Sequence, residues 1–333
     1  MQHKKKFLVF RILPWLVTGA IFAVLFQRVP LPELLQAWRQ IHFLPYLALM
    51  VPYSVLYCTL DAFVLWRVLL WFHGSIPYRR VLPVRAAAYI LALLNPGLGQ
   101  GGVAWSLHRR EGIPFLEIAG SMLFLVVMEC VQLALYAALG IFVLQPHLGV
   151  AFVPVYAVLG IVVGIALLYV HRGIEPLSPL LTWWGRYWRH DATYRYQLRK
   201  ESWPILRTFQ RARGRHYGLT LLYKAPNFLL AVVIHTLALQ LFGVEVPFGV
   251  VFTFLPVIFL AASLPITVAH LGTSQAAWVY FFSAYGEASQ LLAYSLVAHV
   301  TFMLLNGLIG LCFLPQALRG LDDLRWGQRA QEV

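Results

Sequence analysis

Apolar residues occur along most of the chain in long runs, separated by short polar breaks. A helix needs about 20 consecutive apolar residues to cross the hydrocarbon core of a bilayer. By that measure we predict six transmembrane helices, at residues 7–26, 43–66, 115–143, 148–170, 219–242 and 288–315. Charged residues are rare within these runs, so the pattern predicts an all-α polytopic membrane protein.

Two further apolar regions are interrupted too early to be simple spans. In residues 86–105 the apolar run ends at Asn95-Pro96-Gly97, and in residues 248–284 it ends at Leu264-Pro265. Each region reads as a short helix, a Pro/Gly break and a second short helix. Ten helical residues reach only about 15 Å, half of the hydrocarbon core. Such a segment either completes a broken span or turns back as a re-entrant hairpin.

The positions of the basic residues distinguish these two possibilities. If both regions crossed the membrane, residues 171–217, with ten Lys and Arg against three acids, would lie outside together with Arg109 and Arg110. That arrangement inverts the positive-inside rule. If both are hairpins, 24 of the 26 Lys and Arg residues are cytoplasmic or at the cytoplasmic interface, and only Arg28 and Arg39 are outside. We therefore predict two re-entrant hairpins and cytoplasmic N- and C-termini in the cell membrane.

The predicted elements occur in the same order twice. Residues 1–143 and 144–315 each contain two spans, a hairpin and a third span, and residues 316–333 form a tail. The first half starts inside and the second outside, which makes an inverted repeat. In transporters with this architecture the substrate site lies near the bilayer midplane, where the halves meet. We expect the two hairpins to meet there.

Composition agrees with this interpretation and excludes other classes. Of the 333 residues, 60% are hydrophobic and 12% are charged, whereas a soluble domain has about 25% charged residues. A soluble enzyme, a disordered chain and a secreted disulfide scaffold are therefore excluded. The net charge of +13 is explained by the cytoplasmic face, so nucleic acid is not an expected partner. The cysteines and histidines lack the spacing of a metal site, and no metal or cofactor is predicted.

The two hairpin tips are the predicted substrate site. Non-helical backbone at membrane depth must be buried in protein or face a watery cavity. Glycines let a ligand approach the backbone closely, and helix N-termini attract anions such as a phosphate headgroup. The residues predicted to bind substrate at the tips are Asn95, Gly97, Gly99, Gln100, His270, Gly272, Ser274 and Gln275.

Several ionisable residues lie within the apolar segments, where a charge is costly and usually faces a cavity or a partner. They are Asp61, Glu129, His235, His270 and His299. Glu129 lies in mid-span, and we predict it to be a functional acid or counter-ion; the alternative is a protonated carboxyl packed between helices. We add His299 to the substrate site. Asp61 is expected to pair with Arg67 near the cytoplasmic face.

Basic residues at the cytoplasmic face are predicted to form a rim that gathers anionic headgroups. Within residues 171–217, the aromatic positions 183, 184, 187 and 188 fall on one helical face. This pattern is typical of an interfacial amphipathic helix, and a topology anchor alone is an equal alternative. The predicted rim residues are Arg67, Arg109, Arg110, Arg186 and Arg189.

Three segments in order resemble a known family, the membrane (flippase-like) domain of lysylphosphatidylglycerol synthetase/flippase proteins. They are Trp66-Arg67-Val68-Leu69-Leu70 with Gly74, the stretch from Leu94 to Gln100 with Glu129, and the stretch from Leu264 to Ala277 with Gly307 to Gly310. The resemblance implies a protein that moves anionic, aminoacylated or polyprenyl-phosphate-linked lipids between leaflets. Because the chain after Pro315 is short, we expect the translocase part without the soluble synthetase domain.

The chain departs from that family's pattern at the hairpins. The family tends to place Glu after each hairpin glycine, where this chain has Gln100 and Gln275. It tends to place Arg in the following helices, where this chain has Cys130 and His299. An amide can hydrogen-bond a headgroup but cannot carry a proton. These departures argue against proton coupling at these positions and against a cationic aminoacyl-lipid substrate.

We therefore expect a lipid translocase that is not a bond-making enzyme, with membrane lipids as partners. A separate synthase or glycosyltransferase is a second candidate partner. One alternative is a membrane-embedded transferase or phosphatase acting on a polyprenyl phosphate, for which Asp322-Asp323 is the only acidic pair in the sequence. The other is a scaffold that binds a glycosyltransferase through its basic loop.

Overall fold

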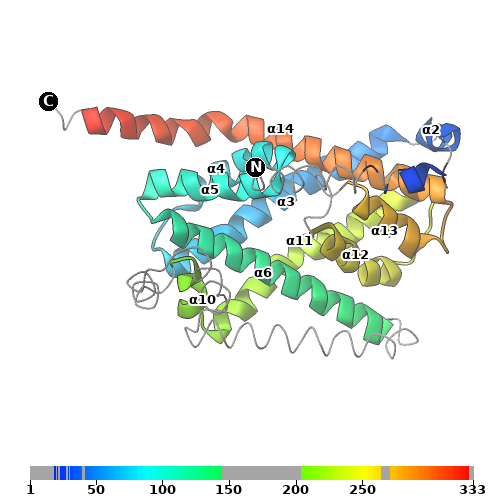
Figure 1. Cartoon of the computed structure of the whole chain (residues 1–333), viewed down its shortest axis with the longest axis horizontal. Helices are drawn as coiled ribbons and strands as arrows, with labels where there is room; N and C mark the ends of the chain where they lie inside the picture. The colour runs from blue at the N-terminus through cyan, green and yellow to red at the C-terminus, as the bar shows by residue number, and fades with distance from the viewer. Residues whose placement is uncertain are drawn as a thin grey trace, which may run out of the picture.

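The described part of the protein is helical and contains no strand (Figure 1). The computed structural model describes residues 19–144 except 20, 22, 28, 30, 40 and 41, and residues 204–263 and 271–329. Four of its helices are long and apolar enough to cross a membrane. They are α3 (Phe43–Phe72), α6 (Phe115–Leu139, extended by a π-helical turn, Gly140–Leu144), α11 (Gly214–Leu241) and α14 (Ala288–Arg329).

These helices coincide with four of the six predicted spans, which confirms the all-α membrane class. The predicted span 148–170 and most of the span 7–26 lie outside the described residues. Helix α14 continues past the predicted end at residue 315 as far as Arg329. The predicted end followed the apolar run, whereas the helix continues through the polar residues that come after it.

The first predicted hairpin consists of α4 (Tyr78–Leu94) and α5 (Pro96–Glu111), which are packed together and joined at Asn95. Asn95 Oδ1 accepts a hydrogen bond of 2.7 Å from the Gly97 N–H and so caps α5, which begins with a proline. Asn at the cap and Pro in the first turn favour a helix start here. At the far ends of the two helices, Arg80 Nη1 lies 3.5 Å from Glu111 Oε2. The chain therefore doubles back at Asn95.

The helices of this hairpin are longer than the sequence predicted. Helix α4 has 17 residues and α5 has 16, so each is about 25 Å long. The prediction of residues 86–105 followed the apolar run alone. Helix α4 begins earlier, in the polar stretch Tyr78-Arg79-Arg80.

The second predicted hairpin, residues 248–284, contains α12 (Phe248–Ser263) and α13 (Thr273–Phe282). The two helices contact each other, and the ring of Phe254 stacks on that of Phe281 with centroids 4.9 Å apart. Residues 264–270, between the two helices, lie outside the described residues.

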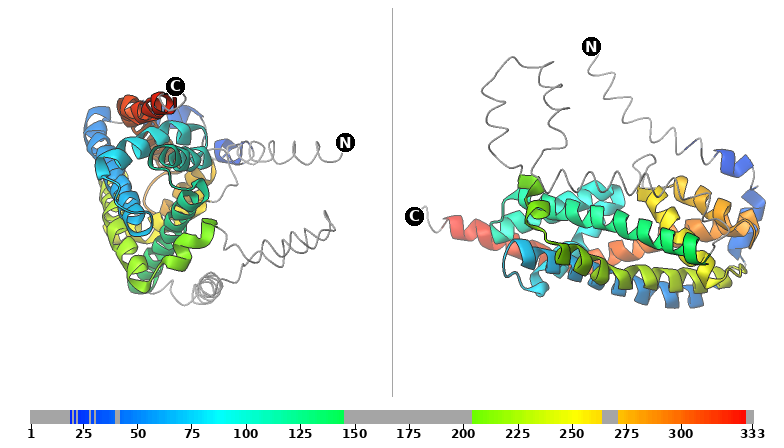
Figure 2. Two further views of the ribbon diagram at one scale, coloured as in Figure 1. Left: turned by 90° about the vertical axis from the view of Figure 1, so that its left-hand side faces the viewer. Right: turned by 90° about the horizontal axis from the view of Figure 1, so that it is seen from below.

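The two hairpins start from opposite ends of the helix bundle (Figures 1 and 2). At one end, where α4 begins and α5 ends, Arg211 Nη1 donates to the Phe72 carbonyl at 3.4 Å. At the other end, where α12 begins, the rings of Tyr46 and Phe242 pack edge to face at 5.7 Å. Charge is sorted between these ends in the described residues. The first end has eight arginines against two acids, and the second has one arginine against three acids. Those of the first end are Arg79, Arg80, Arg109, Arg110, Arg207, Arg211, Arg213 and Arg215, with Glu111 and Glu117; those of the second are Arg39 with Glu33 (both in α2, Leu31–Arg39), Glu245 and Glu287.

Helix α14 runs beside both hairpins and packs most extensively on α4. The order of a long helix, a helical hairpin and a long helix occurs twice, as α3 to α6 and as α11 to α14. The division of the chain at residues 143 and 144 into inverted halves stays a prediction.

Candidate functional site

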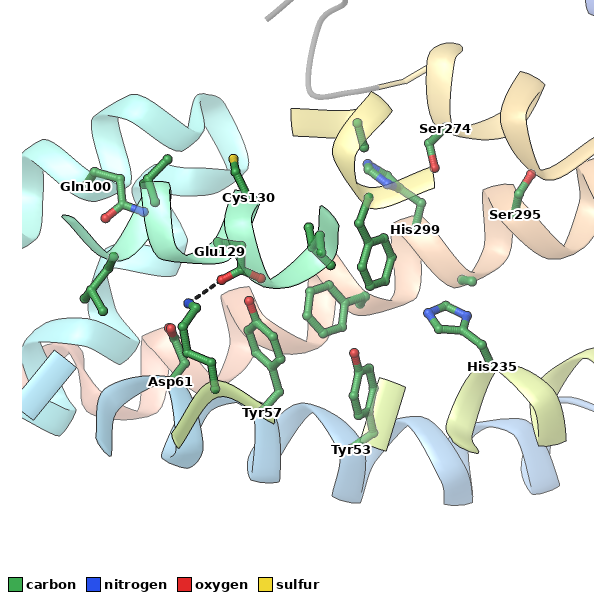
Figure 3. Close-up of a pocket in the computed structure, with 18 of the residues that line it drawn as sticks. Tyr53, Tyr57, Asp61, Gln100, Glu129, Cys130, His235, Ser274, Ser295 and His299 are labelled. Atoms are coloured by element: carbon green, nitrogen blue, oxygen red, sulfur yellow. Dashed lines mark ion pairs between the residues drawn. The ribbon is translucent and has the colours of Figure 1, made fainter. Parts of the chain in front are cut away.

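A cavity of about 400 Å³ lies inside the helix bundle, between the two hairpins (Figure 3). Sites that bind small molecules have volumes of about 300–1,000 Å³, so the cavity is large enough for a lipid headgroup. Its walls come from both hairpins and from α3, α6, α11 and α14. The polar or ionisable residues that line it are Tyr53, Tyr57, Asp61, Arg85, Gln100, Glu129, Cys130, Lys224, His235, Ser274, Ser295 and His299.

One ion pair in the cavity joins α3 to the first hairpin. Arg85 Nε lies 2.6 Å from Asp61 Oδ2, and the hydroxyl of Tyr89 donates to the same oxygen at 2.6 Å. Arg85 Nη1 also donates to Gln100 Oε1 at 3.2 Å. The side chains of Asp61 and Arg85 are only 15% and 14% exposed. This pair is therefore well enclosed and supported by two further hydrogen bonds.

The expected pairing of Asp61 with Arg67 was wrong. The Arg67 guanidinium lies over the rings of Trp66, Trp71 and Tyr223, between 5.4 and 5.8 Å from their centroids. Helix α4 packs against α3 and brings Arg85 to the carboxylate. Arg67 lies six residues further along α3 and is held by aromatic faces, an arrangement that suits a guanidinium.

A second ion pair joins α6 to α11. Glu129 Oε2 pairs with Lys224 Nζ, and the lysine side chain is only 10% exposed. The Glu129 side chain is 52% exposed and points into the cavity, as Figure 3 shows. Glu129 is therefore the partner of a basic group at the cavity wall, and its predicted role as a functional acid or counter-ion stays a prediction.

The other part of the cavity is lined by rings. His235 lies 5.3 Å from Trp278, centroid to centroid, and its Nδ1 shares a hydrogen bond with the Tyr294 hydroxyl. Phe302 packs against Tyr53 at 5.5 Å. The cavity thus has a charged compartment around the ion pairs and an aromatic compartment beside it (Figure 3). Ser274 and His299 line the cavity.

The predicted tip residues of the first hairpin take different places. Gln100 lines the cavity. Asn95 and Gly97 are exposed, and the Asn95 oxygen is used as the helix cap. Gly99 is buried against α4, and a Cβ there would lie 2.9 Å from the Ala92 Cβ. The glycine therefore lets two helices approach each other.

In the second hairpin, Gln275 supports the turn before α13. Gly272 has a φ of +94°, which favours glycine, and its N–H donates to Gln275 Oε1 at 2.6 Å. Gln275 is buried. Ser274, next to it, lines the cavity. His270 lies outside the described residues.

Two of the predicted rim residues lie at the basic end of the bundle. Arg109 lies 5.9 Å from the centroid of the Trp105 ring. Arg110 Nη2 donates to the carbonyl oxygens of Gln316 and Ala317 in α14. Arg186 and Arg189, like the rest of the predicted amphipathic helix before residue 204, lie outside the described residues.

Sequence reasoning missed Arg85 and Lys224, the two basic groups of the cavity. Lys224 lies within the predicted span 219–242, and Arg85 directly precedes the apolar run of the first hairpin. The sequence analysis counted both among the basic residues that set the orientation and assigned neither of them to a site. A charge inside an apolar run was the available signal, because such charges usually face a cavity or a partner.

These features define a helical membrane protein with a polar cavity between two helical hairpins. The family model for the lysylphosphatidylglycerol synthase TM region matches residues 11–310, and the chain belongs to this family. The match confirms the resemblance drawn from the three sequence segments. No curated protein matched the chain.

Proposed function

We propose that the protein is a flippase-like lipid translocase that moves a phospholipid or a polyprenyl-phosphate-linked lipid between leaflets. The headgroup passes through the cavity while the acyl or prenyl chains stay in the bilayer. In this proposal six helices span the cell membrane, and α4–α5 and α12–α13 are re-entrant hairpins from opposite faces. The basic end of the bundle is cytoplasmic, and so are both termini.

The polar cavity between the two hairpins is the observation that carries this proposal. A charged headgroup meets a high barrier in the hydrocarbon core because it loses its hydration. Ion-paired and hydrogen-bonding side chains in the cavity would replace part of that hydration. Lys224 supplies a cation for a phosphate, and ammonium groups are common phosphate partners in proteins.

The charge sorting supports the orientation. The basic groups at the first end would gather anionic lipid at the cytoplasmic surface, where each is worth about 1 kcal/mol. Arg109 and Arg110 belong to this end, next to the end of α5.

Leaflet transfer in reconstituted liposomes tests the proposal. Fluorescent phospholipid is incorporated symmetrically, and a membrane-impermeant reductant quenches the label in the outer leaflet. Liposomes with the protein should lose nearly all fluorescence, whereas protein-free liposomes keep the inner-leaflet half. The double variant Glu129→Gln/Lys224→Met removes one ion pair without changing the net charge and should slow transfer. Tyr280→Phe, at an exposed position, is the matched control and should not.

Other outcomes would support the alternatives. If liposomes with well-folded protein keep the same half of their fluorescence as protein-free liposomes, the translocase proposal is wrong. Release of phosphate from a polyprenyl phosphate by the purified protein would favour the enzyme. Co-purification with a glycosyltransferase, without transfer, would favour the scaffold.

A further inference from the structure

The charged groups of the cavity balance one another. Among the residues that the structure describes, its walls contain the carboxylates of Asp61 and Glu129 and the basic groups of Arg85 and Lys224. Two histidines, His235 and His299, also line it. With histidine counted as neutral, the described walls therefore carry no formal net charge.

The two ion pairs differ in how easily a ligand can reach them. The Asp61 carboxylate is shared by Arg85 and Tyr89, and Arg85 is held by Gln100 as well. Each member of this pair thus has a second protein partner. The Glu129 side chain is 52% exposed and is joined to a single basic group, Lys224. This second pair is the one that a headgroup can open.

A small recess of about 40 Å³ adjoins the cavity at this second pair. The residues that line both are Tyr53, Tyr57, Asp61, Glu129, Lys224 and Phe259. Asn227 also lines the recess, and its Oδ1 is buried without a hydrogen-bond donor among the described residues. A water molecule needs about 10–15 Å³, so the recess can hold an ammonium group. Its acceptors would be the Glu129 carboxylate and the Asn227 oxygen.

We propose that the cavity selects a phospholipid whose headgroup carries one phosphate and one primary ammonium. The phosphate would bind Lys224, and the ammonium would bind Glu129 and Asn227 at the recess, so the headgroup is inserted between the two members of the open pair. This inference rests on the proposed translocase function and adds the charge class of its substrate.

The selectivity follows from the charge balance. A zwitterionic headgroup offers each member of the open pair a new opposite charge, and the cavity stays neutral. A headgroup with a phosphate alone takes Lys224 from Glu129 and leaves that carboxylate without a counter-ion. A charge left without a partner inside the helix bundle is disfavoured. Anionic lipid should therefore move more slowly than zwitterionic lipid.

The test compares two lipids that differ in headgroup and carry the same fluorescent acyl chain, phosphatidylethanolamine and phosphatidylglycerol. Transfer is measured in liposomes at pH 8. With the unmodified protein, phosphatidylethanolamine should move faster by about tenfold, a modest difference on the scale of binding energies. Glu129→Gln leaves Lys224 without its carboxylate and should change the ratio of the two rates toward phosphatidylglycerol by about tenfold. Glu245→Gln makes the same chemical change at the acidic end, outside the cavity, and should leave the ratio unchanged.

The outcomes separate this inference from the function on which it rests. If neither lipid moves, the proposed function fails. If both move and phosphatidylglycerol is as fast or faster with the unmodified protein, the translocase stands and the charge selectivity is wrong. If Glu129→Gln does not fold, Lys224→Met is used instead, and it should change the ratio further toward phosphatidylethanolamine. No change in the ratio with either variant would also overturn the inference.

Discussion

Gly310 in α14 lies so close to Ala86 in α4 that a Cβ at position 310 would come within 2.8 Å of the Ala86 carbonyl oxygen. The same Cβ would lie 2.9 Å from Ile90 Cγ1. Gly307, one turn earlier, faces Leu93 in the same way. Small residues that let helices approach are a common means of helix packing in membranes. This contact fixes the first hairpin to the last helix.

Gly310→Ala should therefore destabilise the protein by about 1–3 kcal/mol, the usual range for overpacking. The midpoint of thermal unfolding in detergent, followed by tryptophan fluorescence, measures the change. The control is Gly218→Ala in α11, where nothing lies within 4 Å of the added Cβ. Since alanine is the better helix former, this control should melt at or slightly above the unmodified protein. A Gly310→Ala variant with the same unfolding midpoint as Gly218→Ala would contradict the close contact at position 310.

Cysteine labelling in intact cells tests the re-entrant topology. In a variant without native cysteines, single cysteines replace Ser75 and Pro114 at the basic end, or Glu245 and Ser283 at the acidic end; all four are exposed. An impermeant maleimide should label positions 245 and 283 and should reach 75 and 114 only after the cells are opened. If α4 and α5 together crossed the membrane, 75 and 114 would be labelled from opposite sides.

Removing one member of the enclosed Asp61–Arg85 ion pair should lower the free energy of unfolding more than removing both members does. Asp61→Asn leaves the Arg85 guanidinium without its carboxylate and should destabilise the protein by about 3–5 kcal/mol. The double variant Asp61→Asn/Arg85→Met removes both charges and should recover much of that loss. Thermal unfolding of Asp61→Asn, Arg85→Met and the double variant gives the coupling energy between the two side chains. Strictly additive effects of the two substitutions would show that the pair does not stabilise the fold.

The two hairpin glutamines should differ in what their loss affects. Gln275 is buried and accepts the hydrogen bond of the Gly272 N–H, so Gln275→Ala should lower stability by about 1–3 kcal/mol. Gln100 lines the cavity and accepts one hydrogen bond from Arg85, so Gln100→Ala should slow lipid transfer and lower the melting temperature less than Gln275→Ala does. Parallel assays of unfolding and transfer on both variants check this. If the two variants changed the melting temperature to the same extent and the transfer rate to the same extent, the two residues would have the same role.

A pH effect is expected at the basic end of the bundle. Burial lowers the pKa of His73, with Glu117 opposing the effect and Arg211 adding to it. Below about pH 6.5 the unfolded chain binds a proton at this residue that the folded protein does not. The free energy of unfolding should therefore fall as the pH drops from about 6.5 to the folded-state pKa of His73. Above about pH 6.5 this residue should make no pH-dependent contribution.

His73→Gln isolates this contribution from those of the other histidines. The amide retains a group that can hydrogen-bond Ser121, whose Oγ lies 2.7 Å from His73 Nε2. The difference in melting temperature between pH 7.5 and pH 5.5 should be smaller in the variant than in the unmodified protein. The same difference in both proteins would contradict the assignment.

Hydrophobicity predicted the helices well because span length and Pro/Gly breaks are local properties. The four long apolar helices and the helix pairs α4–α5 and α12–α13 of the described part follow from such runs. The partners within the cavity were not predictable in this way. Asp61 meets Arg85 only because α4 folds back along α3, and no spacing in the sequence encodes that contact. Gly99 was interpreted as a place for a ligand, whereas it accommodates the neighbouring helix.

The balanced charge of the cavity has an electrical consequence. Moving one elementary charge through a membrane potential of 100 mV involves about 2.3 kcal/mol. A headgroup of zero net charge, moving through walls whose described acids and bases cancel, transfers no charge across the bilayer. The potential of the cell membrane would then neither drive nor oppose the movement, and the distribution of the lipid between leaflets would be set by its own concentrations and by the reactions that consume it on either side.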